Sequence, residues 1–492
     1  MSHLRRRLPA ACGGALCVLL MIASCTVGPD FTAPEAPDRQ LYWQGTLANP
    51  IDALGQRQGF VPGGDVQWNW WTLFRSPALD ALVKRAISGN PSLQAAEASL
   101  RQSQDLLKAG QGVYYPQVSG RFAGYRQQGN GGQPGLGTVD SIFNVVTLSG
   151  TVSYALDIFG GERRTVEGLQ AQVDVQADRL HAAFLALTAN VVNTAIARAA
   201  YAAQMQASEQ LIALQQQQLE VTQAQVRSGT LADSAQASLR SLIATNQAQL
   251  AGLRQRYTQA GHLLVLLGGA APNQMSVPDI SLGSLSLPHD LPVSLPSVLV
   301  RQRPDIRVAE AQLHQASADI GVATAALFPS FTLSAQYGTG GTALGSMFSK
   351  RFWSIGPAID IPLFEGWRRW FGREAARDAY RQAAASYRQV VLSALSQVAD
   401  VLDAVQLDAV ALQKRSESAA AAEAALQALQ ASYRAGLVPY VDVLVADVQL
   451  QQANMLLLDA SAQRRQDTVA LYVALGGGWW NAPQASTRGE AP

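Results

Sequence analysis

The chain has 492 residues and a formal net charge of +1 at pH 7. This balance excludes the broad positive or negative surface field that a nucleic acid or an acidic partner would require. Charged residues make up only 15% of the sequence. Much of the remainder is alanine and glutamine, which are good helix formers.

The N-terminus has the order of a secretory signal, which we place at residues 1–24. A basic stretch, Arg5 to Arg7, precedes a short apolar core from Leu16 to Ala23, and Cys25 follows small residues. Ile22-Ala23-Ser24-Cys25 resembles a bacterial lipobox, so we predict a covalent lipid on Cys25 and no other cofactor. An uncleaved anchor is the alternative, although the apolar core is short for a bilayer span. With Cys12 and Cys17 removed, no disulfide is expected.

Residues 26 to about 65 are rich in proline, glycine and aspartate, which predicts an extended strap. A short amphipathic helix is then expected around Leu79 to Ala86. Asn90-Pro91 predicts the start of a further helix, because asparagine caps a helix and proline fits its first position. Tyr115-Pro116 is expected to end that helix.

Four segments show the period-two alternation of strands. From Val146 to Ile158 the even positions are apolar and the odd positions are small and polar. The alternation returns at 331–337 and 353–361, and a less regular strand is expected at about 118–125. Glycine-rich loops around 129–137 and 338–345 would join the strands in pairs. Strands of about ten residues have the length that crosses a bilayer when tilted.

Two long helical tracts without proline follow the strand pairs, from about Glu162 to Arg227 and from about Gly366 to Arg434. Each would be roughly 100 Å long, with the apolar spacing of a coiled coil. Gly229 and Gly436 stand where a C-terminal cap is expected. Returning helices, at about 232–267 and 440–475, would complete two helical hairpins with tight tips.

The chain therefore contains two internal repeats. The helix start Asn90-Pro91 returns as Arg303-Pro304, and Tyr115-Pro116 returns as Phe328-Pro329. After the signal we assign an N-terminal lipid-anchored extended segment with equatorial elements, then repeat 1, a linker, repeat 2 and a C-terminal tail. Their bounds are 25–89, 90–269, 270–302, 303–478 and 479–492.

Four strands cannot form a closed barrel, which needs at least about eight. An open sheet edge in lipid would leave backbone groups unpaired. We therefore expect several chains to pool their strands, with the polar face lining a wet lumen and the apolar face meeting lipid. Trp353, Trp367 and Trp370 suit an interfacial belt. A soluble, half-buried sheet packed on helices is the alternative interpretation.

Several motifs together resemble the TolC-like outer-membrane efflux family, in its NodT-type lipoprotein branch. They are the lipobox followed by Thr26-Val27-Gly28-Pro29-Asp30-Phe31, then Trp70-Trp71, Arg303-Pro304-Asp305-Ile306, Phe328-Pro329, Tyr433-Arg434-Ala435-Gly436, and Ala474 to Trp479. The resemblance implies an α+β membrane protein that assembles as a homotrimer. Four strands per chain would form a transmembrane β-barrel continuous with a long periplasmic α-helical barrel. Thr26 beside the cysteine would direct the lipoprotein to the outer membrane.

The resemblance also implies a function and its sites. The protein would be the exit duct of a tripartite multidrug or small-molecule efflux pump, with a periplasmic adaptor and a proton-driven inner-membrane pump as partners. Adaptor contacts would lie at the tips, and the gate beside them. The implied contact residues are Gly229, Thr230, Leu231, Gly436, Leu437 and Val438, and the gate candidates are Asp233, Tyr433, Arg434, Val441, Asp442 and Asp447. Related ducts carry an aspartate where this chain has Val445, so Asp442 or Asp447 would have to replace it.

Other classes of function find little support in the sequence. The histidines (His3, His181, His262, His289 and His314) have no zinc-ligand spacing, and no P-loop is present. Gly338-x-Gly340-x-x-Ala343 lacks the following helix that a dinucleotide site needs. We therefore expect no enzyme, no metal site and no nucleic-acid partner. Two alternatives stay open: the exit duct of a type I-like protein secretion system, and a non-conducting structural coiled-coil lipoprotein.

Overall fold

The computed structural model of the chain describes residues 26–35, 51–133 and 136–483. Cys25, the predicted lipidation site, lies outside these residues. Two compact units divide the chain. We call them the strand unit (Met1–Pro34, Ser99–Gln176 and Val308–Tyr387) and the hairpin unit (Glu35–Ala98, Ala177–Arg307 and Arg388–Pro492). Each unit takes segments from both sequence repeats.

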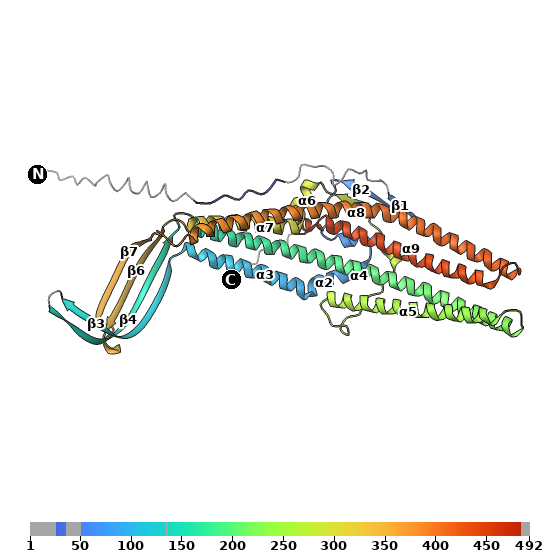
Figure 1. Cartoon of the computed structure of the whole chain (residues 1–492), viewed down its shortest axis with the longest axis horizontal. Helices are drawn as coiled ribbons and strands as arrows, with labels where there is room; N and C mark the ends of the chain where they lie inside the picture. The colour runs from blue at the N-terminus through green and yellow to red at the C-terminus, as the bar shows by residue number, and fades with distance from the viewer. Residues whose placement is uncertain (1–25, 36–50, 134–135, 484–492) are drawn as a thin grey trace. The chain divides into compact units, whose positions relative to one another are not determined.

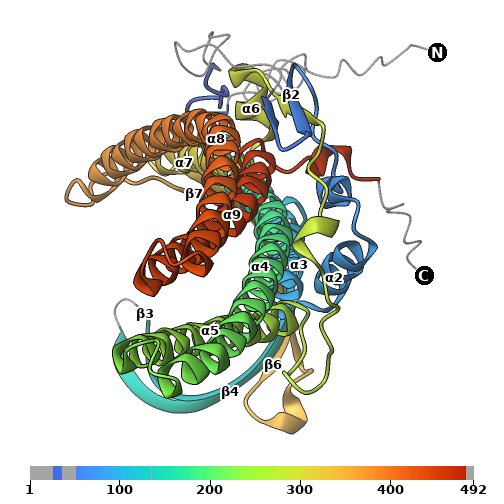
Figure 2. The ribbon, with the colours of Figure 1, turned by 90° about the vertical axis from the view of Figure 1, so that its right-hand side faces the viewer.

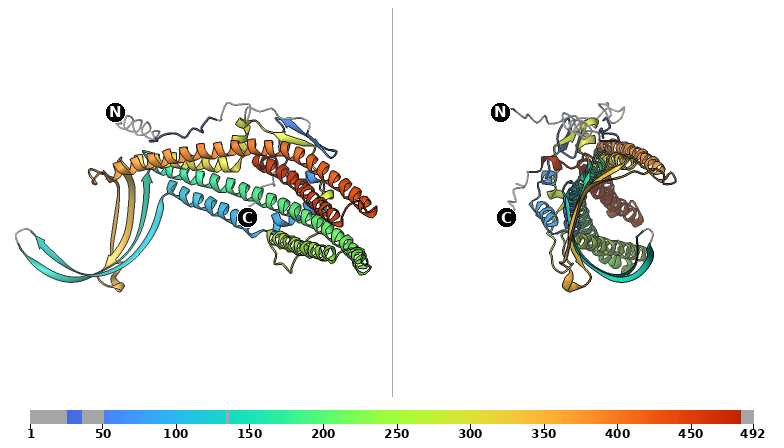
Figure 3. Two further views of the ribbon diagram at one scale, coloured as in Figure 1. Left: turned by 45° about the vertical axis from the view of Figure 1, so that its right-hand side comes forward. Right: turned by 90° about the vertical axis from the view of Figure 1, so that its left-hand side faces the viewer.

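The strand unit contains a four-stranded antiparallel sheet in the order β3-β4-β6-β7. Its strands are β3 (Gln117–Gln133), β4 (Leu136–Leu156), β6 (Ser330–Gly341) and β7 (Lys350–Asp360), and they lie side by side in Figure 3. All four predicted strands are confirmed. The glycine-rich loop expected at 129–137 is wrong, because Gly129 pairs with Ser141 and Gly131 with Val139. Backbone pairing needs no side chain, so glycine does not end the ladder, although a register shift follows Gly131.

The strand register places residues of one kind in the same rows across the sheet. One row joins Val118, Val152, Ala335 and Ile355. The next row joins Ser119, Thr151, Gln336 and Ser354. Because directly opposed residues point to the same face, the alternation of each strand adds up to one apolar face and one polar face.

The helices reproduce the internal repeat in length. The short helices are α2 (Pro77–Gly89), α3 (Pro91–Gly110), α6 (Pro296–Gln302) and α7 (Pro304–Ala325), as Figure 1 shows. The long helices α4 (Gly161–Arg227) and α8 (Arg368–Arg434) have 67 residues each, and α5 (Asp233–Leu267) and α9 (Tyr440–Ala474) have 35 each. The Asn90 side chain accepts hydrogen bonds from the amides of Ser92 and Leu93, which confirms the predicted cap.

The core of the hairpin unit is built around a short aromatic 3-10 helix, Trp70–Phe74. Trp70 and Trp71 are fully buried, and Trp70 stacks on Tyr472 of α9 with 5.6 Å between ring centroids. A small sheet in the order β1-β2-β5 lies in the same unit, with β1 at Ile51–Ala53, β2 at Gln56–Pro62 and β5 at Asp290–Val293. The buried Arg464 of α9 donates to the carbonyls of Ala53 and Gln56. The segment expected to be a bare strap therefore contributes paired strands to this core.

Helices α4 and α8 each hold an 18-residue stretch apolar enough to cross a membrane, with mean hydropathy of 1.5 and 1.4. Each helix is about three times longer than the roughly 20 residues that a span requires. Within the chain itself, 44% of the stretch in α4 and 28% of that in α8 is buried. We attribute the hydropathy to packing faces of the hairpins.

A carboxyl pair lies between α8 and α9. The pKa of Asp408 is raised to about 7, chiefly by burial and further by the neighbouring Asp467 carboxyl. Gln463 donates to the other side of the Asp467 carboxylate at 2.8 Å.

This pair makes a testable contribution to stability. Because the native state binds the Asp408 proton more tightly than the unfolded state, its contribution is present in acid and is lost as pH rises from about 4 to about 7. We expect Asp408→Asn to unfold at a higher temperature than wild type near pH 8, and to lose this pH dependence, in circular dichroism of the detergent-solubilised protein. Asp403→Asn, at an exposed position of α8, is the matched control. Equal pH dependence in wild type and Asp408→Asn would contradict the assignment.

Candidate functional site

The four-stranded sheet exposes its apolar face. Val118, Trp353 and Ile355 are 76%, 71% and 68% exposed, and on the polar face Ser119 and Ser354 are exposed as well. A soluble sheet buries its apolar face against a core and leaves its polar face in water. A sheet that leaves its apolar face uncovered in this way is typical of a protein whose apolar face meets lipid.

The aromatic residues predicted to form an interfacial belt are exposed. Trp353 lies on the apolar face in the row of Tyr337, and Trp367 and Trp370 come just after the strand β7. Trp367 has a positive φ of 66°, which is a strained conformation for so bulky a residue. The chain holds this tryptophan outward at a backbone cost.

The sheet has two unpaired edges, β3 and β7. Because every neighbouring pair within the sheet is antiparallel, β3 and β7 run in opposite directions. The β7 edge of one copy is thus able to pair with the β3 edge of another in the same antiparallel manner. The sheet offers the two complementary edges that a closed ring of copies requires.

The hairpin tips are tight turns closed by the same motif. Gly229 and Gly436 have φ of +75° and +74°. The Gly229 amide donates to the Val226 carbonyl and the Thr230 amide to that of Gln225. Gly436 and Leu437 donate to Tyr433 and Ser432 in the same pattern. These are Schellman caps, and they leave each tip a compact, exposed loop (Figure 2).

The predicted adaptor-contact residues lie in these loops. Gly229, Thr230, Gly436 and Leu437 are exposed, and Leu437 is 77% exposed. Leu231 and Val438 are half-buried. Leu231 packs against an apolar cluster formed by Leu239, Ile243, Leu426, Tyr440, Val443, Leu444 and Ala446. The loops therefore present a small apolar surface on a rigid base.

The predicted gate residues divide into two groups. Asp233, Arg434 and Val441 are exposed, and Asp442 is half-buried in the first turn of α9. Within the described part of the chain, neither Arg434 nor either of these two aspartates forms an ion pair. They are available to other chains.

Tyr433 and Asp447 instead hold the two hairpins of one chain together. The Tyr433 hydroxyl donates to Gln225 of α4 at 3.1 Å, and its ring lies 5.2 Å from that of Tyr440. Gln215 of α4 donates to Asp447 at 2.6 Å and accepts from Asn246 of α5 at 2.9 Å. Burial raises the pKa of the Asp447 carboxyl.

The sequence analysis missed Gln215, Gln225 and Tyr440. Gln215 stands in a run of four glutamines, and nothing in that run shows which side chain points inward. Val445, where the resemblance implies an aspartate, is exposed. It lies in an apolar stripe with Val441 and Val448 on α9.

Within the strand unit, the segment that follows Cys25 is bound like a ligand. The Val27 amide donates to the Phe159 carbonyl at 3.0 Å. Gly28, at φ +98°, lies against Gly321 of α7 so closely that a Cβ atom would stand 2.5 Å from the Gly321 Cα. Only glycine permits this backbone approach. We call residues Thr26–Phe31 the docked strap.

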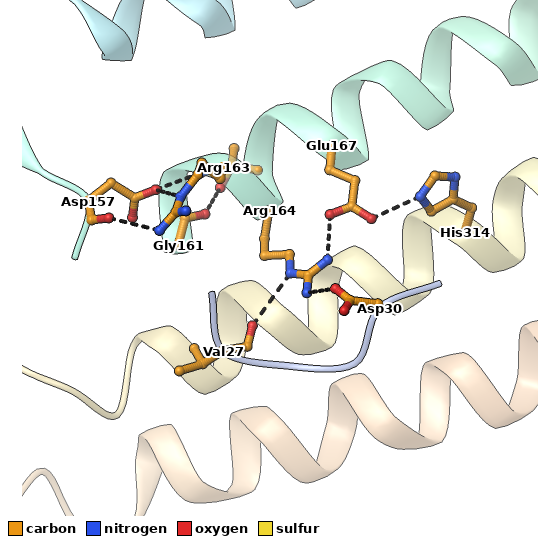
Figure 4. A network of polar contacts seen from close by, with 9 residues as sticks. Val27, Asp30, Asp157, Gly161, Arg163, Arg164, Glu167 and His314 are labelled. Atoms are coloured by element: carbon orange, nitrogen blue, oxygen red, sulfur yellow. Dashed lines mark hydrogen bonds and ion pairs between the residues drawn. The ribbon is translucent and has the colours of Figure 1, made fainter. Parts of the chain in front are cut away.

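Arg164 is the centre of the polar network that holds the docked strap (Figure 4). It is 4% exposed and donates to Asp30 at 2.6 Å and to Glu167 at 2.7 Å. His314 of α7 lies 2.9 Å from the other Glu167 oxygen, and its ring stacks on Phe31 at 4.4 Å. The Arg164 guanidinium thus connects the docked strap to Glu167 of α4, and Glu167 in turn contacts His314 of α7.

The docked strap yields a second testable prediction. Arg164→Ala removes charge-assisted bonds of about 1–3 kcal/mol in total, so the strap should open about tenfold more often. We expect cleavage by chymotrypsin after Phe31 to accelerate accordingly, as followed by mass spectrometry. Arg163→Ala is the control, because Arg163 binds Asp157 and not the strap. Equal cleavage of wild type and Arg164→Ala would contradict the role of Arg164.

Among the described residues, no three histidine, cysteine or acidic side chains gather closely enough to hold a metal ion. The features that the structure brings together are a sheet with a lipid-type outer face, two open edges, two capped tips and a docked strap. They suit a membrane-embedded assembly that is built from several chains.

Comparison with known proteins gives these features a family. The family described as "Outer membrane efflux protein" matches residues 82–270 and 295–477. Nodulation protein T of Rhizobium leguminosarum bv. viciae is 30% identical, covering 96% of this chain and 94% of its own length. The cation efflux system protein CusC of Escherichia coli O6:H1 is 29% identical over 94% and 98% of the two chains. The solved outer-membrane channel OprN has a TM-score of 0.82 at 27% identity, covering 92% of this chain and all of that one.

Proposed function

Because the chain belongs to the outer membrane efflux protein family, we propose that it is the exit duct of a tripartite efflux pump. It is an outer-membrane protein of a family of channels and not an enzyme. In the proposed role it passively conducts substrates that an inner-membrane transporter delivers through a periplasmic adaptor. Because the sequence contains no P-loop, the energy would come from the partner, for which we expect a proton-driven transporter.

The observation that carries the proposal is the sheet with an exposed apolar face and two open edges. An unpaired backbone group in hydrocarbon costs several kcal/mol, and the edges of β3 and β7 carry a row of such groups. Three copies would supply twelve strands, enough to close a barrel. The polar face of serines, threonines and glutamines would then line the lumen. A non-conducting stalk would have no use for such a lining.

The hairpins support the remaining parts of the proposal. Three copies would bring twelve helices together, and the exposed apolar stripe Val441, Val445 and Val448 would meet neighbouring chains. The exposed tip residues around Gly229 and Gly436 would contact the adaptor. Arg434 and Asp442, which lack ion-pair partners within the described chain, would bond across chain boundaries. Each such exposed pair contributes only about 0–1 kcal/mol, so a gate would depend on their repetition by symmetry.

Deletion of the gene should sensitise the host to small toxic compounds. We expect lower inhibitory concentrations for at least one class among dyes, detergents, antibiotics and metal ions, with recovery on expression of the full chain. Unchanged sensitivity to all four classes would contradict the proposal. Sensitivity that stays unchanged while a secreted polypeptide accumulates inside the cell would favour the protein-secretion duct.

The anchor gives an independent prediction. Cys25 follows the signal and directly precedes the docked strap, so we expect it to carry the lipid. Wild type should incorporate labelled palmitate, whereas Cys25→Ser should incorporate none. No further cysteine follows Cys25 in the sequence, so the chain without its signal offers no second thiol. Labelling of Cys25→Ser would show that the lipid is elsewhere.

A further inference from the structure

The polar face of the sheet carries two cationic residues in neighbouring rows. Arg121 of β3 lies in the row of Ser149, Gly338 and Phe352. Lys350 of β7 lies in the next row of that face, with Ala123, Thr147 and Gly340. Successive rows on one face are about 7 Å apart. The two cations stand on the two edge strands.

Neither cation is neutralised by the described residues. The partner of Arg121 is the Tyr125 hydroxyl, which accepts from Nη2 at 3.2 Å and holds the guanidinium over the polar face. Neither residue forms a salt bridge within the described chain. No described side chain in the two rows is acidic.

At the opposite end of the sheet, the charged residues are acidic and have basic neighbours. Asp157, directly after β4, binds the Arg163 backbone and side chain. Asp360, the last residue of β7, lies near Arg369, whose pKa is raised chiefly by its bonds to Glu365 and to a lesser extent by the charge of Asp360. The acids at this end thus have arginines beside them. The charge of the two rows of Arg121 and Lys350 stays uncompensated.

We propose that these rows form a cationic ring that makes the barrel lumen selective for anionic solutes. The inference rests on the proposed function, since it requires a closed barrel whose polar face is the lumen. Closure would bring the β7 edge of one copy beside the β3 edge of the next. Lys350 of one chain and Arg121 of its neighbour would then alternate around the lumen, three of each in a trimer.

The physical basis is the sign of charge in a narrow polar pore. Rings of charged side chains set the ion preference of a channel, and low-dielectric walls concentrate their field. Arginine remains protonated at any relevant pH. Phe352 lies against Gly338 in the Arg121 row, where a Cβ atom on Gly338 would stand 2.5 Å from the ring. The phenyl ring of Phe352 adds an apolar surface beside the cations, and this combination suits organic anions.

The test uses the full trimer in planar bilayers, with inorganic tripolyphosphate added on the barrel side alone. The wild-type conductance should fall, because the multiply charged tripolyphosphate anion binds the cationic ring. In Arg121→Gln/Lys350→Gln the concentration for half-maximal block should rise by about an order of magnitude. Addition on the opposite side should block less. Side-specific addition separates the ring from Arg227 and Arg434 near the hairpin tips, which could also bind the anion.

Two matched variants make the result specific. Arg121→Lys/Lys350→Arg keeps the charge and should keep the block. Arg351→Gln removes a cation next to Lys350 but on the apolar face, and should also behave as wild type. A wild type that is insensitive, or a double glutamine variant that is blocked equally, would overturn the inference and leave the duct intact. A wild type without any channel would overturn the proposed function and this inference with it.

Discussion

The structure depends on one constraint, the pairing of backbone groups at a sheet edge that faces hydrocarbon. β4 and β6 satisfy their groups within the chain, whereas β3 and β7 each leave one side open. In water such an edge would be hydrated, but the exposed Val118, Trp353 and Ile355 show that the outer face is built for lipid. In the proposed duct, copies of the same chain would pair with the open edges, and the opposite directions of these edges permit a closed ring.

The repeat explains how one chain meets this constraint with regular parts. Each repeat supplies one pair of strands, one 67-residue helix and one 35-residue return helix. Gly229 and Gly436 close both hairpins with the same cap, and polar links such as Gln215 to Asp447 tie the hairpins together. Arg434 and Asp442 form no ion pair with the described residues, and in the proposed trimer they would be free to bind neighbouring chains. Some polar residues thus bind within the chain and others stay exposed, and the proposed oligomer accounts for this difference.

Sequence alone predicted the parts that repeat with a fixed period. The alternation gave β6, β7 and the C-terminal part of β4, the uninterrupted helical tracts gave the hairpins within a few residues, and Asn90 marked its helix start correctly. The sequence did not predict that β3 extends through Gly129 and Gly131, because glycine-rich stretches are typical of loops. Hydrogen bonds between strands need only backbone atoms, so these glycines still pair. The sequence also did not predict that the side chains of Asp447 and Gln215 point inward, since an aspartate on an amphipathic helix usually faces water. The row shared by Arg121 and Phe352 needs strand register, which one sequence does not contain. The adaptor and gate roles of the tip residues stay predictions.

The central claim is that a single copy of the chain cannot close its own sheet and must assemble with other copies. Its most direct test is the molar mass of the detergent-solubilised wild-type protein, measured by light scattering after correction for bound detergent. The account predicts three copies per particle that resist dissociation until the strands unfold. A stable, folded particle of one copy with intact strand content would contradict it.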